Sequence, residues 1–237
     1  VDCCHISKID STKDKRFFEM CSPVIYVCSN SANASKNVIS TLLKMRLEEC
    51  GASVVNFSSN KYAHILGQKH YPESVFDDKN EIGERYEALV KFFKSIDKDA
   101  HPDVYIMTSP NPQMYGNCEA SVLPDVFSLL PPPDYIILCL ISHNYSKDEL
   151  DYFSGLYINY KKVDCCYISQ NAYNFMLNKD FSSDLYEMVR HTDKVSAHIS
   201  REITARGTKA FSNADDVVDY VMKDFYEKYY IPDNLVL

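Results

Sequence analysis

A strand, loop, helix and strand near the start of the sequence constrain the fold more than any other feature. The run PVIYVC, from Pro23 to Cys28, is a short apolar segment opened by a proline, which is typical of a buried strand. From Lys36 onward, apolar residues recur at helical spacing until Gly51, a suitable C-terminal cap. The run ASVVNF, from Ala52 to Phe57, indicates a second strand. Strands joined through a helix lie parallel and cross over in the right-handed sense, so this unit predicts a parallel sheet.

Three later apolar runs extend the predicted sheet, and helical periodicity lies between them. The runs are Val104 to Thr108, Asp134 to Ser142 and Val163 to Ser169. Alternating strands and helices predict an α/β fold with a doubly wound, mainly parallel sheet and helices on both faces. We expect the first strand to lie at the centre of the sheet, between the strands that begin at Val104 and Asp134.

The remaining segments are assigned by period and by capping residues. Ser58 to Asp78 shows no clear period and is expected to be a long loop. The other expected elements are a helix after Asn80, a short helix around Ala120 to Leu130, a helix opened by the capping box of Ser146 and Glu149, a helix from Ser183 or Asp184 to Arg206, a crossover through Phe211, and a last helix from Asn213 to Tyr230.

Length and the lack of a linker indicate one large domain. The chain has 237 residues, and neither internal repeats nor low-complexity tracts divide it. We assign residues 1–22 to an N-terminal extension, expected to be partly disordered, and residues 23–237 to the α/β domain. The sequence begins at Val1 rather than at methionine, as in a trimmed chain or the later part of a longer polypeptide, so a preceding domain is left open.

Composition argues against two classes of partner. The formal net charge is −8 and no long basic run is present, whereas nucleic-acid phosphates need clustered lysine and arginine. The longest apolar stretch, Tyr135 to Ile141, is far shorter than the roughly 20 residues that cross a bilayer, so we expect no membrane partner. The nine cysteines are odd in number and mostly lie in apolar runs, which indicates reduced thiols and a cytoplasmic protein. The oligomeric state is left open.

The turn after the first strand stands where a Walker A loop would join a strand to a helix. It reads C-S-N-S-A-N-A-S-K-N from Cys28 to Asn37, against G-x-x-x-x-G-K-[ST] in the motif. Matching Lys36 to the motif lysine places Asn30 at the first glycine and Ser35 at the second. Asn37 then replaces the serine or threonine that binds magnesium.

Such a loop binds phosphate through main-chain N–H groups, a helix N-terminus and a lysine that reaches the β and γ phosphates. Lys36 meets the last condition, and Asn30 and Asn33 are the best substitutes for glycine where left-handed torsions are needed. Ser29, Ser31 and Ser35 add hydroxyl groups. In the alternative interpretation, Ser35 and Asn37 simply start the helix and Lys36 is solvated.

Other strand ends meet the same edge of a parallel sheet and add candidate residues. Ser109 stands where a Walker B carboxylate is expected, and Glu119 or Asp125 could replace that carboxylate. His143 and Asn144 could face a base or a substrate, or form a loop pair without ligand. We predict no catalytic residue and no metal-ligand set; Cys28 is favoured as a core residue over a nucleophile.

Four stretches carry a resemblance to a known family. They are VIYVCSNSANASKNVISTLLKMRLEECGASVVNFSSNKYAHILG, PDVYIMTSPNP, DYIILCLISHN and VDCCYIS. Together, from about Pro23 to Ser169, they resemble the P-loop domain of clostridial peptide-maturation proteins, related to the dethiobiotin synthetase-like class of P-loop NTPases. That family's loop usually reads close to T-S-S-x-Q-G-K-F-T; Ser31, Asn33 and Lys36 fall on it, and Ser35 replaces its glycine.

The resemblance implies a three-layer sandwich of the P-loop NTPase type, with ATP or a related nucleotide and magnesium as cofactor. The few glycines, the lack of tryptophan and the abundant tyrosine fit a bacterial source. The resemblance also implies an accessory role in maturing a ribosomally synthesised, post-translationally modified peptide, with a peptide substrate or a maturation enzyme as partner. Two alternatives stay open. One is a non-catalytic scaffold for a precursor peptide or maturation enzyme, and the other is a small-molecule transferase that uses the same crevice. If the chain is an enzyme, we expect weak ATP-dependent activity.

Overall fold

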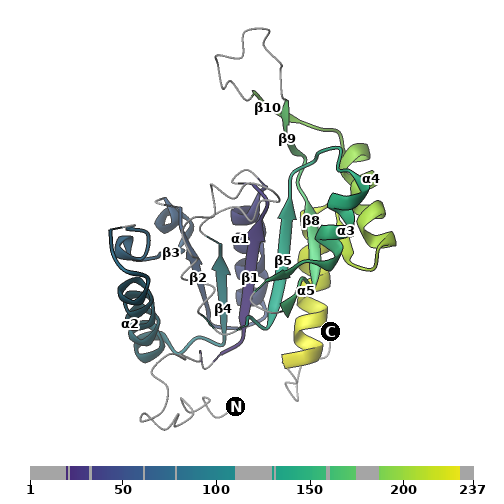
Figure 1. Cartoon of the computed structure of the whole chain (residues 1–237). Helices are drawn as coiled ribbons and strands as arrows, with labels where there is room; N and C mark the ends of the chain where they lie inside the picture. Colours follow the sequence, from purple (N-terminus) through teal and green to yellow (C-terminus); the bar gives the residue numbers. More distant parts are fainter. Residues whose placement is uncertain are drawn as a thin grey trace.

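A seven-stranded parallel sheet forms the centre of the computed structural model (Figure 1). The structure describes residues 20, 22–31, 34–60, 62–77, 79–109, 130, 132–158, 161–174 and 187–229. In spatial order the strands are β11 (Lys209–Phe211), β8 (Cys165–Ile168), β5 (Tyr135–Leu140), β1 (Val24–Ser29), β4 (Val104–Thr108), β2 (Val54–Ser58) and β3 (Lys69–His70).

The predicted position of the first strand is confirmed. β1 pairs in parallel with β4 on one side, where Val24 lies opposite Tyr105, and with β5 on the other, where Ser29 lies opposite Cys139. β5 is buried along its whole length, as expected for a central strand covered on both faces. The doubly wound, parallel α/β fold expected from the sequence is therefore present.

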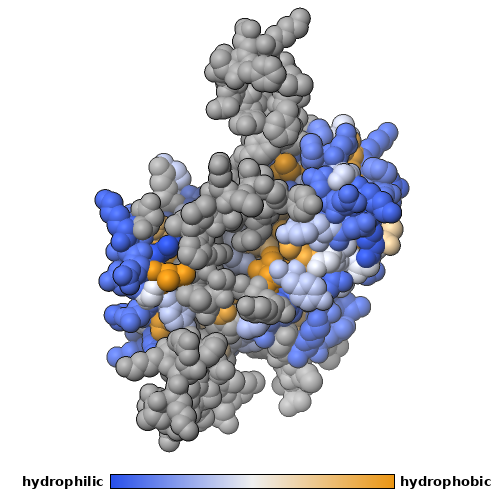
Figure 2. All heavy atoms as spheres, viewed as in Figure 1, coloured by the Kyte–Doolittle hydropathy of each residue, from blue (hydrophilic) through white to orange (hydrophobic). Residues whose placement is uncertain are grey.

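Helices cover both faces of the sheet and make three layers. One face carries α1 (Lys36–Glu49) and α5 (Ala214–Tyr229), and the other carries α2 (Ile82–Ala100), α3 (Lys147–Gly155) and α4 (Asp193–Ala205). Successive side chains of β1 alternate between the two cores: Val27 packs with α1 and α5, whereas Cys28 lies in the core under α2, α3 and α4. In Figure 2, hydrophilic side chains lie over the outer flanks of the face that it shows.

Two short antiparallel pairs lie outside the main sheet. They are β6 (Tyr157–Ile158) with β7 (Lys161–Lys162), and β9 (Asn171–Asn174) with β10 (Glu187–Arg190). The β9–β10 pair projects beyond the carboxyl ends of the central strands (Figure 1). The helix expected from Ser183 or Asp184 is thus wrong over Glu187–Arg190, because these residues pair with β9 and the helix begins only at Asp193.

Short edge strands account for two more corrections. The segment Ser58 to Asp78, expected to be a loop, contains β3, which pairs with the end of β2, and two short 3-10 helices, Ala63–Leu66 and Glu73–Val75. The expected crossover through Phe211 is strand β11, paired in parallel with β8. Strands of two or three residues are too short to show a period, so their pairing partners define them.

Helix boundaries agree more closely with the sequence patterns. The capping box of Ser146 and Glu149 is confirmed at the start of α3, and α1 begins at Lys36. The cap of α2 is Glu81 with Glu84, rather than Asn80. The helix expected around Ala120 to Leu130 lies outside the described residues except at Leu130. Among the helices that the structure describes, none is long and apolar enough to cross a membrane.

Candidate functional site

The loop between β1 and α1 lies at the carboxyl edge of the sheet, at its topological switch point. From β1 the chain passes through α1 to β2 on one side, whereas β5 and β8 extend the sheet on the other. Connections that diverge from a central strand leave a crevice above its carboxyl end, which is the usual ligand position in open parallel sheets.

Ser35 has an unusual backbone for a serine. Its torsions are φ 62 and ψ 21, in the left-handed region, and it is the N-cap of α1. Among the described residues, the other non-glycine residue with positive φ is His101, at the C-cap of α2. A left-handed conformation costs an L-residue about 1 kcal/mol or more. The strain falls at the position that the motif alignment assigns to the second glycine.

The side chain of Ser35 points to the neighbouring strand end rather than into its own helix. Its Oγ lies 2.9 Å from Oγ of Ser169, the residue after β8. It also accepts a hydrogen bond from Nδ2 of Asn171, at 3.4 Å. The hydroxyl at the glycine position therefore attaches the loop to the end of β8 and the start of β9.

Lys36 is buried, and its amine already donates a hydrogen bond to another part of the protein. Its side chain is 6% exposed, and Nζ donates a hydrogen bond of 2.6 Å to the main-chain oxygen of Ser109. Burial lowers the pKa of Lys36, because desolvation disfavours its charged form. The alternative in which Lys36 is solvated is therefore wrong: the amine crosses from α1 to the end of β4.

Unpaired hydroxyl groups lie beneath the loop. Oγ of Ser29 and Oγ of Ser109 are buried without a hydrogen-bond partner as far as the described residues show. These residues end β1 and follow β4, two neighbouring strands of the sheet. Beside them, Thr108 donates a hydrogen bond of 3.0 Å to the carbonyl of Phe57 and joins β4 to β2. A buried hydroxyl without a partner is costly, so this floor can take a further polar group.

Asn30 braces the other side of the loop. Its Oδ1 accepts from the main-chain N of Ile141 at 3.1 Å, and its Nδ2 donates to the hydroxyl of Tyr145 at 2.9 Å. Tyr145 in turn donates to the carbonyl of Ile141 at 2.7 Å. Burial raises the pKa of Tyr145, which keeps the phenol neutral. The Asn30 amide thus ties the loop to the end of β5.

The remaining loop residues have separate positions. The carbonyl of Ser31, a buried residue, accepts from the main-chain N of Ala34 at 3.2 Å. Oδ1 of Asn37 accepts from Oγ of Ser58, at the end of β2, at 3.3 Å. Asn33 lies outside the described residues. Asn37 therefore faces the β2 side, opposite to the side that Ser35 contacts.

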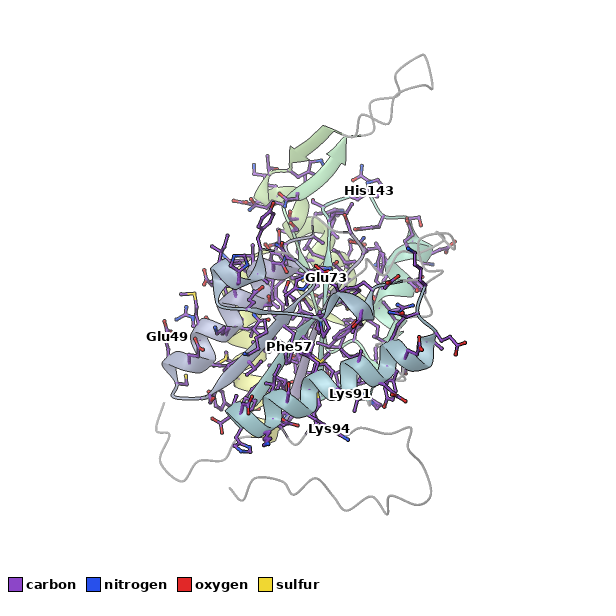
Figure 3. The ribbon with its side chains drawn as sticks, turned by 90° about the vertical axis from the view of Figure 1, so that its left-hand side faces the viewer. Glu49, Phe57, Glu73, Lys91, Lys94 and His143 are labelled. Atoms are coloured by element: carbon purple, nitrogen blue, oxygen red, sulfur yellow. The ribbon has the colours of Figure 1, made fainter. Side chains whose placement is uncertain are left out.

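His143 and Asn144 follow β5 at the same edge of the sheet. Figure 3 shows His143 at this edge, away from Phe57 within the layers. The half-buried His143 ring packs edge to face on Tyr145, with centroids 5.5 Å apart, and Asn144 is exposed. The structure brings His143 to Asn30 through Tyr145, whereas Asn144 makes no such connection in the described part.

A cavity of about 550 Å³ opens beside Ser35. It lies between the N-termini of α1, α4 and α5 and the ends of β8 and β11. Hydroxyl and amide groups dominate its wall, with two carboxylates and no lysine or arginine among the residues that line it. The lining residues are Ser35, Tyr167, Ser169, Gln170, Asn171, Asp193, Ala197, Ser212, Asn213, Ala214 and Asp215.

The donor set around the loop is poor for a divalent metal. The described residues contain no group of three or more His, Cys, Asp or Glu side chains that could hold a metal ion. Asn37 and Ser58 offer neutral oxygens, and these already bond to each other. Glu119 and Asp125, the carboxylates weighed as Walker B substitutes, lie outside the described residues. Cys28 is fully buried, and burial raises the pKa of its thiol, which opposes a nucleophilic role.

Sequence reasoning missed Tyr145 and the far wall of the cavity. Tyr145 stands two residues beyond His143, and its hydroxyl rather than a charged group makes the connection to the loop. Ser169 ends the predicted strand Val163 to Ser169 and Asn171 follows it, so the rule that found Ser109 could have found them. Asp193 and Asn213 begin helices that pack beside the loop only in three dimensions.

Neither the family models nor the curated proteins compared with this chain match it in sequence. Several solved structures are similar in fold. A LAO/AO transport system kinase is 12% identical with a TM-score of 0.47; the alignment covers 87% of this chain and 58% of that one. Hydrogenase maturation factor HypB from Archaeoglobus fulgidus is 10% identical, with 86% and 90% covered and a TM-score of 0.43. A complex of Cyanothece McdA with ATP is 9% identical, with 88% and 92% covered and a TM-score of 0.46. These likenesses concern the fold alone.

Proposed function

We propose that the chain binds ATP or a related nucleotide at the β1–α1 loop and does not hydrolyse it efficiently. The observation that carries the proposal is the left-handed backbone of Ser35 directly before Lys36. Strained torsions of non-glycine residues cluster at active sites and ligand-binding loops. Here such a torsion occurs at the position of the motif glycine, at the N-terminus of a 14-residue helix.

The floor of the loop supports a phosphate in this position. Ser29 and Ser109, at the ends of β1 and β4, have buried hydroxyls without partners among the described residues, and Lys36 bonds to the main chain of Ser109. A phosphate would offer Lys36 a charged acceptor in place of the neutral carbonyl of Ser109, and hydrogen bonds to charged groups are the stronger ones. We therefore assign the β and γ phosphates to Lys36 and the helix N-terminus.

The cavity beside Ser35 supports a nucleoside next to those phosphates. Its volume of about 550 Å³ lies in the range of small-molecule sites, and it adjoins the loop through Ser35. Its amide and hydroxyl groups can pair with a base and a ribose, and its two carboxylates disfavour phosphate there. The charged end of the ligand therefore belongs at Lys36 and the neutral end in the cavity.

The residues present do not fit a magnesium centre for phosphoryl transfer. Such a centre needs a hydroxyl after the loop lysine and a carboxylate at a strand end. Asn37 and Ser109 occupy these two places, and neither carries a negative charge. We derive no hydrolytic step from this site.

The proposal extends to a role in peptide maturation, with a precursor peptide or a maturation enzyme as partner. The resemblance of Pro23 to Ser169 to the clostridial family supports it. A radical enzyme or a peptide exporter encoded beside this gene would strengthen this role. An isolated metabolic context would instead favour the small-molecule transferase.

Calorimetry with ATP and magnesium tests the binding proposal. The parent should release or absorb heat with saturation, and Lys36→Ala should weaken binding at least tenfold, since hydrogen bonds to charged groups contribute about 1.5–3 kcal/mol. Lys91→Ala is the matched control, because Lys91 lies exposed on α2 and should leave affinity unchanged (Figure 3). Absence of heat with every nucleotide would refute nucleotide binding and leave the non-catalytic scaffold.

A further inference from the structure

A chain of hydrogen bonds joins the loop to the projecting β9–β10 pair. Asn171, the first residue of β9, donates from its main-chain N to Oγ of Ser169 at 3.2 Å. Its side-chain amide donates to Oγ of Ser35 at 3.4 Å, and the hydroxyls of Ser35 and Ser169 lie 2.9 Å apart. The three residues close a ring of contacts between the N-cap of α1 and the start of β9.

A second set of hydrogen bonds holds the β9–β10 pair to the end of β5. The main-chain N of Ser142 donates to the carbonyl of Asn171 at 2.8 Å, while the main-chain N of His191 donates to that of Gln170 at 2.8 Å and closes the base of the pair itself. Nδ1 of His191 lies 3.2 Å from Oγ of Ser142. The base of the pair is thus attached at two places, the end of β5 and the loop.

These two attachments differ in what a ligand can change. The contacts at Ser142 are made with the main chain of Asn171 and the ring of His191 and do not include the loop, although Asn171 also lines the cavity proposed for the nucleoside. Ser35 is part of the loop that would surround the phosphates, and its backbone is strained. Glycine would hold the same torsion without strain, so the hydroxyl is what serine adds at this position. Because Ser169 is 1% exposed, water competes little for the bond that this hydroxyl makes.

We propose that Ser35 is a positioning residue that transmits the state of the loop to the β9–β10 pair. A bound phosphate that moves the Ser35 backbone changes its contacts to Ser169 and Asn171, and hence the stability of pairing at the base of β9. The pair projects from the body, where a partner can distinguish the two states (Figure 1). The inference rests on the proposed function, because its ligand is the nucleotide of that site.

Amide hydrogen exchange of the full chain, with and without AMP-PNP and magnesium, tests the transmission. In the parent, the ligand should change exchange rates at the amides of Asn171–Asn174 and Glu187–Arg190 at least threefold. In Ser35→Ala and Ser169→Ala, each saturated as judged by calorimetry, this change should fall below 1.5-fold, our chosen threshold. Ser40→Ala is the control: Ser40 is a buried serine of α1 whose hydroxyl donates to its own helix, and it should keep the parent response.

A double-mutant cycle without ligand tests the link itself. Ser35→Ala and Ser169→Ala should each accelerate exchange of the Asn171–Asn174 amides. The double variant should accelerate exchange by less than the product of the two single effects, because both substitutions remove the Ser35–Ser169 bond, while each also removes its own bond to Asn171. If exchange in the double variant is accelerated by the full product of the two single effects, the link is overturned. This cycle needs no nucleotide, so it remains decisive if the chain binds none.

The outcomes separate the inference from the proposed function. A ligand that binds without changing exchange in the β9–β10 pair would overturn the inference alone, as would a response that survives in Ser35→Ala. Absence of binding by any nucleotide would overturn the proposed function and the transmission. The ligand-free cycle would then show whether Ser35 still holds the base of β9 as a structural contact.

Discussion

The two sides of the β1–α1 loop are built differently. On the side of β4, protein groups bond to one another: Lys36 donates to the carbonyl of Ser109, and Thr108 joins β4 to β2, while among the described residues Oγ of Ser109 has no partner. On the side of β8, Ser35 borders a cavity of about 550 Å³ with a polar wall. A ligand can thus enter beside β8 without displacing protein contacts. To engage Lys36 it must first replace a short internal hydrogen bond, which places a cost on phosphate binding but not on nucleoside binding.

Filling the cavity on the β8 side should have the largest effect on nucleotide affinity. Ala197 lines the cavity from α4, and Ala197→Phe should lower ATP affinity tenfold to a hundredfold, since a ring there excludes a ligand of similar size. Binding of inorganic triphosphate should change less than twofold, our chosen limit, because it uses the β4 side. Ala205→Phe, on the exposed part of the same helix, is the control. Equal loss for both ligands would show that the two sides are not separate subsites.

Removing a hydrogen bond on the β4 side should lower the free energy of unfolding. Thr108→Val removes the hydroxyl that donates to the carbonyl of Phe57 and leaves that buried acceptor without its donor. We expect the free energy of unfolding to fall by about 1–2 kcal/mol, measured by urea denaturation. Thr192→Val is the control, because Thr192 is exposed and its side chain makes no capping hydrogen bond. A loss equal to that of the control would mean that the β4 side is not held by this bond.

The buried amine of Lys36 should appear in the pH dependence of stability. Burial lowers the pKa of Lys36 below its value in the unfolded chain, so between the two values the unfolded chain binds more protons. The free energy of unfolding of the parent should therefore rise with pH in that interval, relative to Lys36→Met. Urea denaturation from about pH 7 to about pH 10.5, near the ordinary lysine pKa, measures this difference.

The exposed Lys91 provides the comparison for this experiment. Lys91→Met should follow the parent at every pH, because the Lys91 side chain is 78% exposed. If the free energies of unfolding of the parent and of Lys36→Met change in parallel with pH, Lys36 is not buried in solution. The β4 side is then already accessible to a phosphate.

Much of the fold, and one half of the site, could be predicted from the sequence. The strand Val104–Thr108 and the start of α1 at Lys36 coincide with the patterns, because long apolar runs and caps are local signals. β10 and β11 were missed because pairing partners define them. The alignment to Walker A located Ser35, but its torsion and its contact with Ser169 depend on a strand more than a hundred residues later. The cavity is assembled from such distant segments, so no local pattern describes it.

The smallest expected effect concerns restoring the motif itself. Ser35→Gly removes the left-handed strain and Asn37→Thr restores a hydroxyl after the lysine, so together they should tighten nucleotide binding about two- to fivefold. The gain is small because glycine also frees the unfolded chain and loses the bond to Ser169. ATP turnover should stay at background in a steady-state phosphate-release assay, since Ser109 still stands where a carboxylate must hold magnesium.

The contrast between the two sides of the loop explains why binding and turnover should separate in this variant. Ser35→Gly acts on the β8 side, at the edge of the cavity, where it changes the fit of the ligand. Turnover depends on the β4 side, where this variant leaves the bond between Lys36 and Ser109 in place and adds no negative charge. Robust hydrolysis by the parent, abolished by Lys36→Ala, would show that a carboxylate outside the described residues completes the β4 side. The loop would then have to be treated as catalytic rather than as a binding site alone.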